Sequence, residues 1–463
     1  MRDRLLRSFP EAALTLLAML AALACAQALE PGAASAVLAV VLSLSLARSH
    51  LAGERRGRLE AWLALPLVSL ASVGVGALLH DVPWAGATVF VALMALSIWL
   101  RRFGPLALRA GSLVALPLVT LLVAPPLPAH GGGTLARVLA PVGIALAAMA
   151  CVTLAESIGR RLGWLAPTDP DAAAPDASPA TAGALRPSAH TRMALQMAVA
   201  LAVSFAIGAA WFPSHWRWIV LTAFIVNSGN RGRQDVVHKS ALRVAGAAGG
   251  TVAAIALGRF AGVDGLLAGA AILSCVFLGT WLRPLGYGWW SLFVTLALAL
   301  LQGLQPGGTG PVALLCERLV EIGIGAVVGV AAAWFVLPVR STDVLRRRLA
   351  DALAAMSEAL DPQHVARSSR AVTASLRRVE QLRPSFHARR VALGRWRAPQ
   401  PADWIDTLVA CEAPIVALVE RGETPGAVRR AIGAARQSLR EPARIGPALA
   451  ALRDMLSSPP AVS

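Results

Sequence analysis

Long apolar runs separated by short polar connections occupy most of the first 340 positions of the chain. A helix needs about 20 apolar residues to cross the roughly 30 Å hydrocarbon core of a bilayer, and somewhat fewer where the bilayer thins. Twelve runs meet or approach this length, and the pattern predicts an all-α polytopic membrane protein. The runs are 11–29, 31–48, 60–79, 83–100, 110–125 and 136–158 in the first half, and 191–212, 216–230, 241–262, 264–282, 287–304 and 314–338 in the second.

The amino-acid composition also indicates a membrane protein. The 463 residues are 56% hydrophobic and 15% charged, with a mean hydropathy of +0.61. An ordinary soluble domain is about 45–50% apolar and about 25% charged, so a soluble enzyme is excluded. The net charge of +17 does not indicate nucleic-acid binding, because the basic residues lie between apolar runs and in the tail, as in cytoplasmic loops of membrane proteins. The expected partner is therefore the lipid bilayer.

The two halves of the membrane region resemble each other. A Pro/Ala/Asp/Ser-rich linker at 163–190 separates residues 1–162 from residues 191–340. WLRRFG at 99–104 recurs as WLRPLG at 281–286, at the end of the fourth apolar run in each half. Arg137 likewise recurs as Arg318. The matching offsets predict two six-helix repeats, and an even number of crossings makes them parallel.

Orientation follows from the positive-inside rule. With the amino terminus inside, the basic residues ahead of position 341 fall almost entirely on the inner side, which places both termini in the cytoplasm. Trp84, Trp211, Trp216 and Trp218 are then expected at the outer headgroup level. The first apolar run follows three arginines and is also typical of a secretory signal, but its cleavage would break the six-plus-six symmetry. Retention as the first membrane helix is favoured.

Charge returns after position 340, where Ser341, Thr342 and Asp343 are suited to begin a helix. Apolar residues then recur at helical spacing, which predicts a cytoplasmic helical domain over 341–463. An excess of arginine over acidic residues could also hold this domain against anionic headgroups.

Polar groups inside lipid are costly and therefore mark candidate functional sites. The last apolar run begins CERLVEIGIG, which places Glu317, Arg318 and Glu321 on neighbouring helical positions. One interpretation is an interfacial ion-pair cluster that reaches water. The alternative is that Arg318 attracts an anion while Glu321 or Glu317 titrates in a proton relay.

A second group of candidates surrounds the eighth and ninth runs. Asn227 and Asn230 bracket a Ser-Gly pair, which predicts an early helix end, either as an ordinary inner loop or as the break that lines a transport vestibule. Arg243 lies just inside the ninth run. The pairs Gly246/Gly250 and Gly325/Gly329 have the small-xxx-small spacing that allows helices to pack closely.

Other chemistry has no visible site. The five cysteines and eight histidines form no metal-ligating clusters, and no cofactor is expected. Gly131–Gly133 lacks the Lys and Ser/Thr of a phosphate-binding loop, and neither a serine elbow nor a paired-His zinc motif occurs. The protein is expected not to be an enzyme, and uphill transport would need an ion gradient or a partner.

Three stretches resemble the fusaric acid resistance family, also called the aromatic acid exporter superfamily. They are WRWIVLTAFIV at 216–226 with the following basic loop, Arg243 and Gly249–Thr251; LRPLGYGWWSLFVTLALALL at 282–301; and RLVEIGIGAVVGVAAAWFVLP at 318–338. The resemblance implies an inner-membrane protein whose relatives export aromatic carboxylic acids by proton-motive force or, in plants, conduct organic anions. Many such exporters place a soluble helical domain between their membrane halves, whereas here it follows the second half.

Three functions fit these observations. The first is a proton-coupled secondary exporter of small organic anions, of the aromatic carboxylate class that the resemblance implies. The second is a passive organic-anion channel between the repeats. The third is a membrane scaffold whose tail, 341–463, recruits an envelope partner. Assembly into a homo-oligomer stays open.

Overall fold

A computed structural model describes residues 2–49, 55–123, 134–165, 187–213, 215–258, 265–303, 311–363, 369–394 and 400–457. Regular structure in these ranges is helical throughout. The chain divides into two compact units, which are described separately. The first unit comprises the described residues up to 165, from 187 to Gly229 and from Lys239 to Leu337, and the second comprises Asn230–His238 and the described residues from Pro338 onward.

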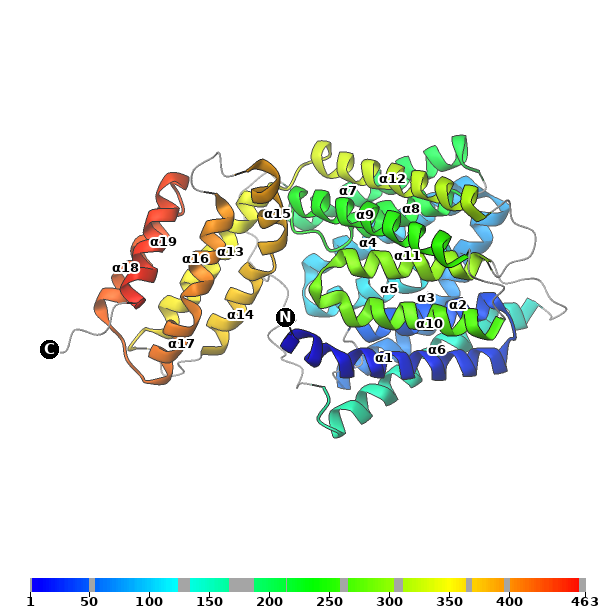
Figure 1. Cartoon of the computed structure of the whole chain (residues 1–463), viewed down its shortest axis with the longest axis horizontal. Coiled ribbons are helices and arrows are strands. Elements are labelled where there is room, and N and C mark those ends of the chain that lie inside the picture. Colours follow the sequence, from blue (N-terminus) through cyan, green and yellow to red (C-terminus); the bar gives the residue numbers. More distant parts are fainter. Residues whose placement is uncertain are drawn as a thin grey trace. The chain divides into compact units, whose positions relative to one another are not determined.

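Twelve α-helices of the described residues precede position 336, and each overlaps one of the twelve predicted apolar runs (Figure 1). In the first half they are α1 (Arg2–Leu29), α2 (Ala33–Ser49), α3 (Arg55–Asp81), α4 (Pro83–Trp99), α5 (Pro105–Val123) and α6 (Thr134–Arg161). In the second half they are α7 (Ala189–Trp211), α8 (Trp216–Asn227), α9 (Arg233–Gly258), α10 (Gly265–Leu282), α11 (Tyr287–Gly303) and α12 (Pro311–Phe335). Short 3₁₀ turns follow α4 and α10, at Leu100–Phe103 and Arg283–Leu285.

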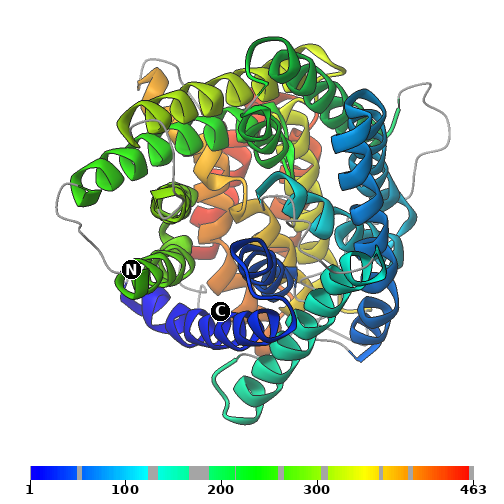
Figure 2. The ribbon, with the colours of Figure 1, turned by 90° about the vertical axis from the view of Figure 1, so that its right-hand side faces the viewer.

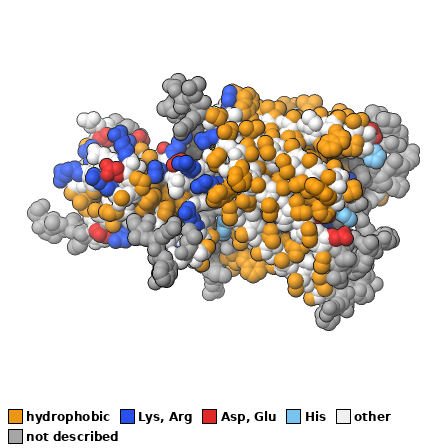
Figure 3. Space-filling view, turned by 90° about the horizontal axis from the view of Figure 1, so that it is seen from above, with side chains coloured by type: hydrophobic (Ala, Val, Ile, Leu, Met, Phe, Trp, Pro, Cys, Tyr) orange, Lys and Arg blue, Asp and Glu red, His pale blue; other side chains and the backbone are white. Residues whose placement is uncertain are grey.

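Eight of these helices in the described part of the chain are long and apolar enough to cross a membrane. Shorter apolar stretches lie within α2, α5, α8 and α11. Side chains such as Leu63, Leu67, Val327 and Phe335 are largely exposed on the first unit, and apolar side chains cover the face of it that Figure 3 shows. Such a surface is stable only in lipid. The chain is an all-α, multi-pass membrane protein, and twelve crossings remain a prediction.

Some helix contacts of the first half have a counterpart in the second. The helix α1 packs against α2 and α6, while α7 packs against α8 and α12 (Figure 2). The first helix of each half also packs against the fourth helix of the other half. The helix α1 lies beside α10, and α7 lies beside α4.

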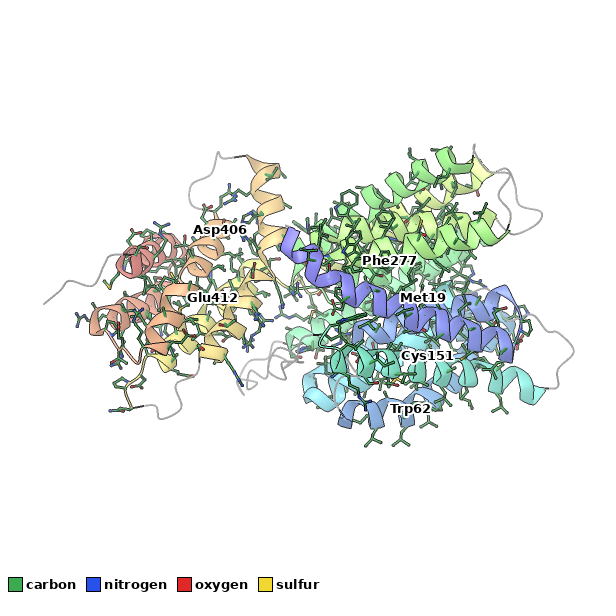
Figure 4. The ribbon with its side chains drawn as sticks, turned by 60° about the horizontal axis from the view of Figure 1, so that its bottom comes forward. Met19, Trp62, Cys151, Phe277, Asp406 and Glu412 are labelled. Carbon is green, nitrogen blue, oxygen red and sulfur yellow. The ribbon has the colours of Figure 1, made fainter. Side chains whose placement is uncertain are left out.

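Aromatic rings join both of these exchanged pairs. Phe9 of α1 contacts Phe277 and Trp281 of α10, with ring centroids 5.8 Å and 5.5 Å apart, and Figure 4 shows Phe277 beside α1. Phe90 of α4 contacts Phe205 of α7 at 5.6 Å. The Trp281 indole also donates a hydrogen bond to the Leu5 carbonyl at 3.0 Å. Each half is therefore held in part by the first helix of the other.

The linker predicted at 163–190 lies mostly outside the described residues. Where the structure resumes, Ser188 caps α7 by accepting a hydrogen bond from the Thr191 amide at 3.2 Å. The Ser hydroxyl satisfies one of the free amides at the helix start, which fixes where α7 begins.

From Ser341 onward, the described part of the second unit contains seven amphipathic helices whose apolar faces form one core, including Leu349, Trp404 and Ile432. They are α13 (Ser341–Ala359), α14 (Ser369–Glu380), α15 (Arg383–Leu393), α16 (Pro401–Ala410), α17 (Glu412–Glu420), α18 (Gly426–Ser438) and α19 (Pro442–Ser457). Figure 4 labels Asp406 on α16 and Glu412 at the start of α17. The sequence predicted a helical domain here, and its cytoplasmic location remains a prediction.

The segment Asn230–His238, which contains the start of α9, belongs to this second unit. The Arg233 amide donates to the Val339 carbonyl at 3.1 Å, and the Gln234 amide donates to Ser341 Oγ at 3.0 Å. Gly232 makes this approach possible, since it has a φ of +120° and an added Cβ would lie 2.7 Å from Ser341 Oγ. Two backbone amides at the start of α9 are thus satisfied by the segment that begins α13.

Candidate functional site

The charged side chains buried among the described residues of the first unit are Arg243, Arg318 and Glu321, with 2%, 2% and 1% of their surface exposed. All three belong to the second half of the membrane region, on α9 and α12. We refer to these three residues as the buried charge cluster. Burial of charge in an apolar medium is expensive unless the charge is paired, so the partners of each group decide what the cluster can do.

The Arg318 side chain packs on an aromatic ring. Its guanidinium carbon lies 4.0 Å from the centre of the Trp218 ring on α8. Among the described residues, none of its Nε, Nη1 and Nη2 atoms has a hydrogen-bond partner. A cation over an indole face is stabilised by about 2 kcal/mol when both are desolvated, yet that contact leaves the guanidinium edge unsatisfied.

Two glycines bring α12 close to α8. A Cβ added at Gly325 would lie 2.5 Å from the Ile219 carbonyl oxygen, and one at Gly329 would lie 2.8 Å from Asn227 Nδ2. Arg318, Glu321 and Gly325 are spaced i, i+3 and i+7, so they share one face of α12. The close helix contact therefore holds the Arg318 guanidinium against α8.

Glu321 is buried without a hydrogen bond. Neither carboxylate oxygen has a partner among the described residues, and Oε1 lies 3.8 Å from Nδ1 of His215, just before α8. The His215 side chain is 39% exposed, so it links the buried carboxylate to the surface. Glu317, the other acidic candidate, is exposed. The structure thus distinguishes the buried Glu321 from the exposed Glu317, whereas the sequence allowed either carboxyl group to take part in a proton relay.

Arg243 comes to the cluster from α9. Its Nη1 donates to Ser291 Oγ on α11 at 3.4 Å, while the Ser291 hydroxyl donates to the Arg243 carbonyl at 3.0 Å. Nε has no partner among the described residues. The charge of Arg243 acts on Arg318, so the two guanidinium groups lie within electrostatic range of each other. Two cations and one acid are therefore gathered from separate helices.

Glycines also set the distance between α9 and α11. A Cβ at Gly246 would lie 2.7 Å from the Gly288 carbonyl oxygen, and one at Gly250 would lie 2.5 Å from the Leu292 carbonyl oxygen. Both would collide with backbone, which cannot move aside easily. The position of Arg243, one turn before Gly246, depends on this close packing.

The two asparagines occupy different places. The helix α8 ends at Asn227, as the sequence predicts, and its 12 residues extend about 18 Å, well short of the bilayer core. Asn227 is buried, with Nδ2 donating to the Ala223 carbonyl at 3.0 Å and Oδ1 unpartnered among described atoms. Asn230 is buried in the second unit. The structure therefore does not group Asn230 with the buried charge cluster.

Sequence reasoning missed the partners of the cluster. Trp218 was expected in an outer aromatic belt, but only 8% of it is exposed, because it packs beneath Arg318. His215 and Ser291 carried no signal in sequence, since neither forms a motif with residues nearby. The first-half counterpart of Arg318, Arg137, lies among residues whose side chains are not described.

Residues 193–332 match the family model described as fusaric acid resistance protein-like. This segment belongs to that family. The match runs from α7 into α12 and contains every member of the buried charge cluster. Members of this family are transporters rather than enzymes. No curated protein matches the chain at a significant level. The resemblance seen in the sequence is thus confirmed over the second half of the membrane region.

Proposed function

We propose that the protein is an inner-membrane secondary transporter that exports organic anions of the aromatic carboxylate class, with a proton as the coupling ion. The observation that carries this proposal is the buried Arg318 guanidinium, held by its face on Trp218 and free of hydrogen bonds along its edge among the described residues. A carboxylate binds a guanidinium edge through two parallel hydrogen bonds. Such a ligand would satisfy the donors that the protein leaves unpaired.

The charge balance supports an anionic ligand. Arg243 and Arg318 contribute two positive charges and ionised Glu321 one negative charge, so the cluster has a net charge of one positive when Glu321 is ionised. A monoanion would lower the positive charge of the site, whereas a cation would add to its cost in an apolar environment. The aromatic ring of Trp218 also offers an apolar surface beside the cluster, although Arg318 occupies one of its faces.

The burial of Arg318 and Glu321 favours transport over an interfacial ion pair. Charged side chains that merely reach toward water keep their charged ends exposed. Here both side chains are almost completely buried. Their placement against α8 is typical of intramembrane charges that line a substrate or ion path.

The proposed topology has twelve crossings in two parallel repeats with both termini in the cytoplasm. Its support is the matching contacts of α1 and α7, each of which packs against the second and sixth helices of its own half and against the fourth helix of the other half. A twofold axis along the membrane normal relates parallel repeats and would produce this exchange.

Transport into everted vesicles tests the proposal. Vesicles from cells that make the full chain should accumulate labelled aromatic carboxylates, and an imposed proton gradient should change the rate. Arg318→Gln should reduce uptake by tenfold or more, because loss of one partner of a buried charge-assisted pair typically costs about 2–5 kcal/mol. Arg217→Gln is the matched control, since Arg217 is an incompletely buried arginine near Trp216 at the start of α8.

The same vesicles separate the competing functions. Flux that follows membrane voltage and ignores the proton gradient would establish an anion channel instead. Absence of flux, together with stable capture of an envelope protein through residues 341–463, would establish a scaffold. Either result would contradict the proposed transporter.

A further inference from the structure

Glu321 is placed to compete with any anion for Arg318. The two residues are separated by three positions on α12 and face the same neighbouring helix. Both carboxylate oxygens of Glu321 and all three guanidinium nitrogens of Arg318 lack hydrogen bonds among the described residues. Arg318 also acts electrostatically on Glu321. The carboxylate is thus the nearby negative charge that an incoming anion would have to replace.

Several other charged groups surround Glu321. Glu317, one turn earlier on α12, is exposed and acts on Glu321 electrostatically. His215 approaches from the residues before α8 at 3.8 Å, and Arg243 from α9 acts on Arg318. On α8, the Arg217 guanidinium lies over Trp216, with its carbon 5.7 Å from the ring centre. The charged or titratable residues of α7, which also packs on α12, are His190 and Arg192 at its start.

We infer that a proton on Glu321 and an organic anion beside Arg318 bind together, each favouring the other. This inference rests on the proposed function, because it concerns the same site. While Glu321 is ionised, its charge partly neutralises Arg318 and repels an anion. Protonation removes that charge and leaves the two arginines with a net charge of two positive, which the anion then lowers to one. By thermodynamic reciprocity, a bound anion favours protonation of Glu321 to the same extent.

The coupling has a definite sign for transport. If one proton and one monoanion cross together, no net charge moves, and the direction of net flux follows the product of proton and anion concentrations on the two sides of the membrane. An inward proton gradient therefore opposes export, which requires a cytoplasmic excess of the anion that outweighs that gradient.

Equilibrium binding of an anion to the purified full-length chain tests whether a proton on Glu321 favours anion binding. Labelled benzenesulfonate is a suitable probe, because it stays a monoanion between about pH 5.5 and about pH 8 and any pH effect arises in the protein. The wild-type protein should bind it about tenfold more tightly at the lower pH, within the usual range of coupling between sites. Glu321→Gln should bind with the tighter affinity at both values of pH. Arg318→Gln should bind at least tenfold more weakly at both.

Glu317→Gln is the matched variant, and it should still bind the probe more tightly at the lower pH, because the exposed Glu317 carboxyl group can be removed while Glu321 and Arg318 stay in place. Tighter wild-type binding at high pH, or weaker binding by Glu321→Gln than by the wild type, would overturn the inference while leaving an anion site in place. The pH profile of the wild-type protein shows whether the proton favours or opposes anion binding, even where a variant fails to fold. Absence of binding by every form at both pH values would instead reject the proposed function itself.

Discussion

Arg318 and Trp218 form the contact on which the site depends, with the guanidinium carbon 4.0 Å from the centre of the indole ring. Trp218→Leu should weaken binding of aromatic carboxylates by about tenfold or more, because a desolvated cation–π contact of about 2 kcal/mol no longer holds the guanidinium. Trp218→Phe should fall between Leu and the wild type, since Phe keeps an aromatic face. Binding measured by equilibrium dialysis checks the order, and equal loss in both variants would show that the ring face does not matter.

Helix packing predicts a difference between two glycines on α12. Gly325→Ala should lower thermal stability in detergent by about 1–3 kcal/mol, because the new methyl group would press on the Ile219 carbonyl oxygen. Gly323→Ala is the control, since nothing lies within 4 Å of an added Cβ there. That variant should match or slightly exceed the wild type. Similar melting temperatures for the two variants would mean that α8 and α12 do not pack this closely.

The start of α9 offers a prediction about the second unit. Ser341→Ala should speed hydrogen exchange in peptides that contain the Gln234 amide, because that amide loses its hydroxyl acceptor. The expected cost is about 1 kcal/mol, or roughly fivefold in local exchange. Ser375→Ala, whose hydroxyl donates to the Val372 carbonyl within its own helix, should leave that peptide unchanged. Exchange is followed by mass spectrometry on the full chain.

Cys411 predicts a pH dependence. Burial raises the pKa of its thiol from an ordinary value of 9.0 to about 11, and nearby Arg453 offsets only part of this shift. The protonated thiol therefore contributes stability that is present below about pH 9 and is lost as pH rises toward about 11. At neutral pH its thiolate population should be about one hundred times smaller than that of an ordinary thiol.

Alkylation by iodoacetamide measures this effect on a chain in which the other cysteines are alanine. These are Cys25, Cys151, Cys275 and Cys316. Labelling of folded Cys411 should be slow at neutral pH and should become fast when the chain is denatured. Rapid labelling of the folded chain would show that the thiol is neither buried nor protonated as described.

Two tryptophans test the proposed topology. Trp84, at the start of α4, and Trp164, after α6, are 66% and 51% exposed, and the twelve-crossing arrangement places them on opposite sides. In a cysteine-free background, Trp84→Cys should react with a membrane-impermeant maleimide in intact cells, whereas Trp164→Cys should react only after permeabilisation. Reaction of both in intact cells would contradict the arrangement.

Much of the fold can be predicted from local sequence. Apolar stretches such as 83–100 and 191–212 become helices because no other local structure satisfies backbone hydrogen bonds in lipid. The end of α8 at Asn227 and the helical tail after Ser341 also follow from nearby residues. The candidates Arg243, Arg318 and Glu321 stand out for the same reason, since charge is rare in apolar runs.

The partners of these residues could not be predicted in this way. Trp218 resembles other interfacial tryptophans in sequence, and His215 and Ser291 resemble ordinary loop and helix residues. Glu317 and Glu321 both appear able to carry a proton until one is seen to be exposed and the other buried. Their differences arise from contacts between helices that are distant along the chain.

The sequence by itself therefore determined that this chain is helical, lies in lipid and carries a few intramembrane charges, because apolar length and local charge are properties of neighbouring residues. Only the tertiary structure decided that Arg318 lies against Trp218, that Arg243 approaches it from another helix and that Glu321 is left without a hydrogen bond. These relationships depend on how closely helices approach, which glycines such as Gly325 and Gly246 permit and which no single segment can specify.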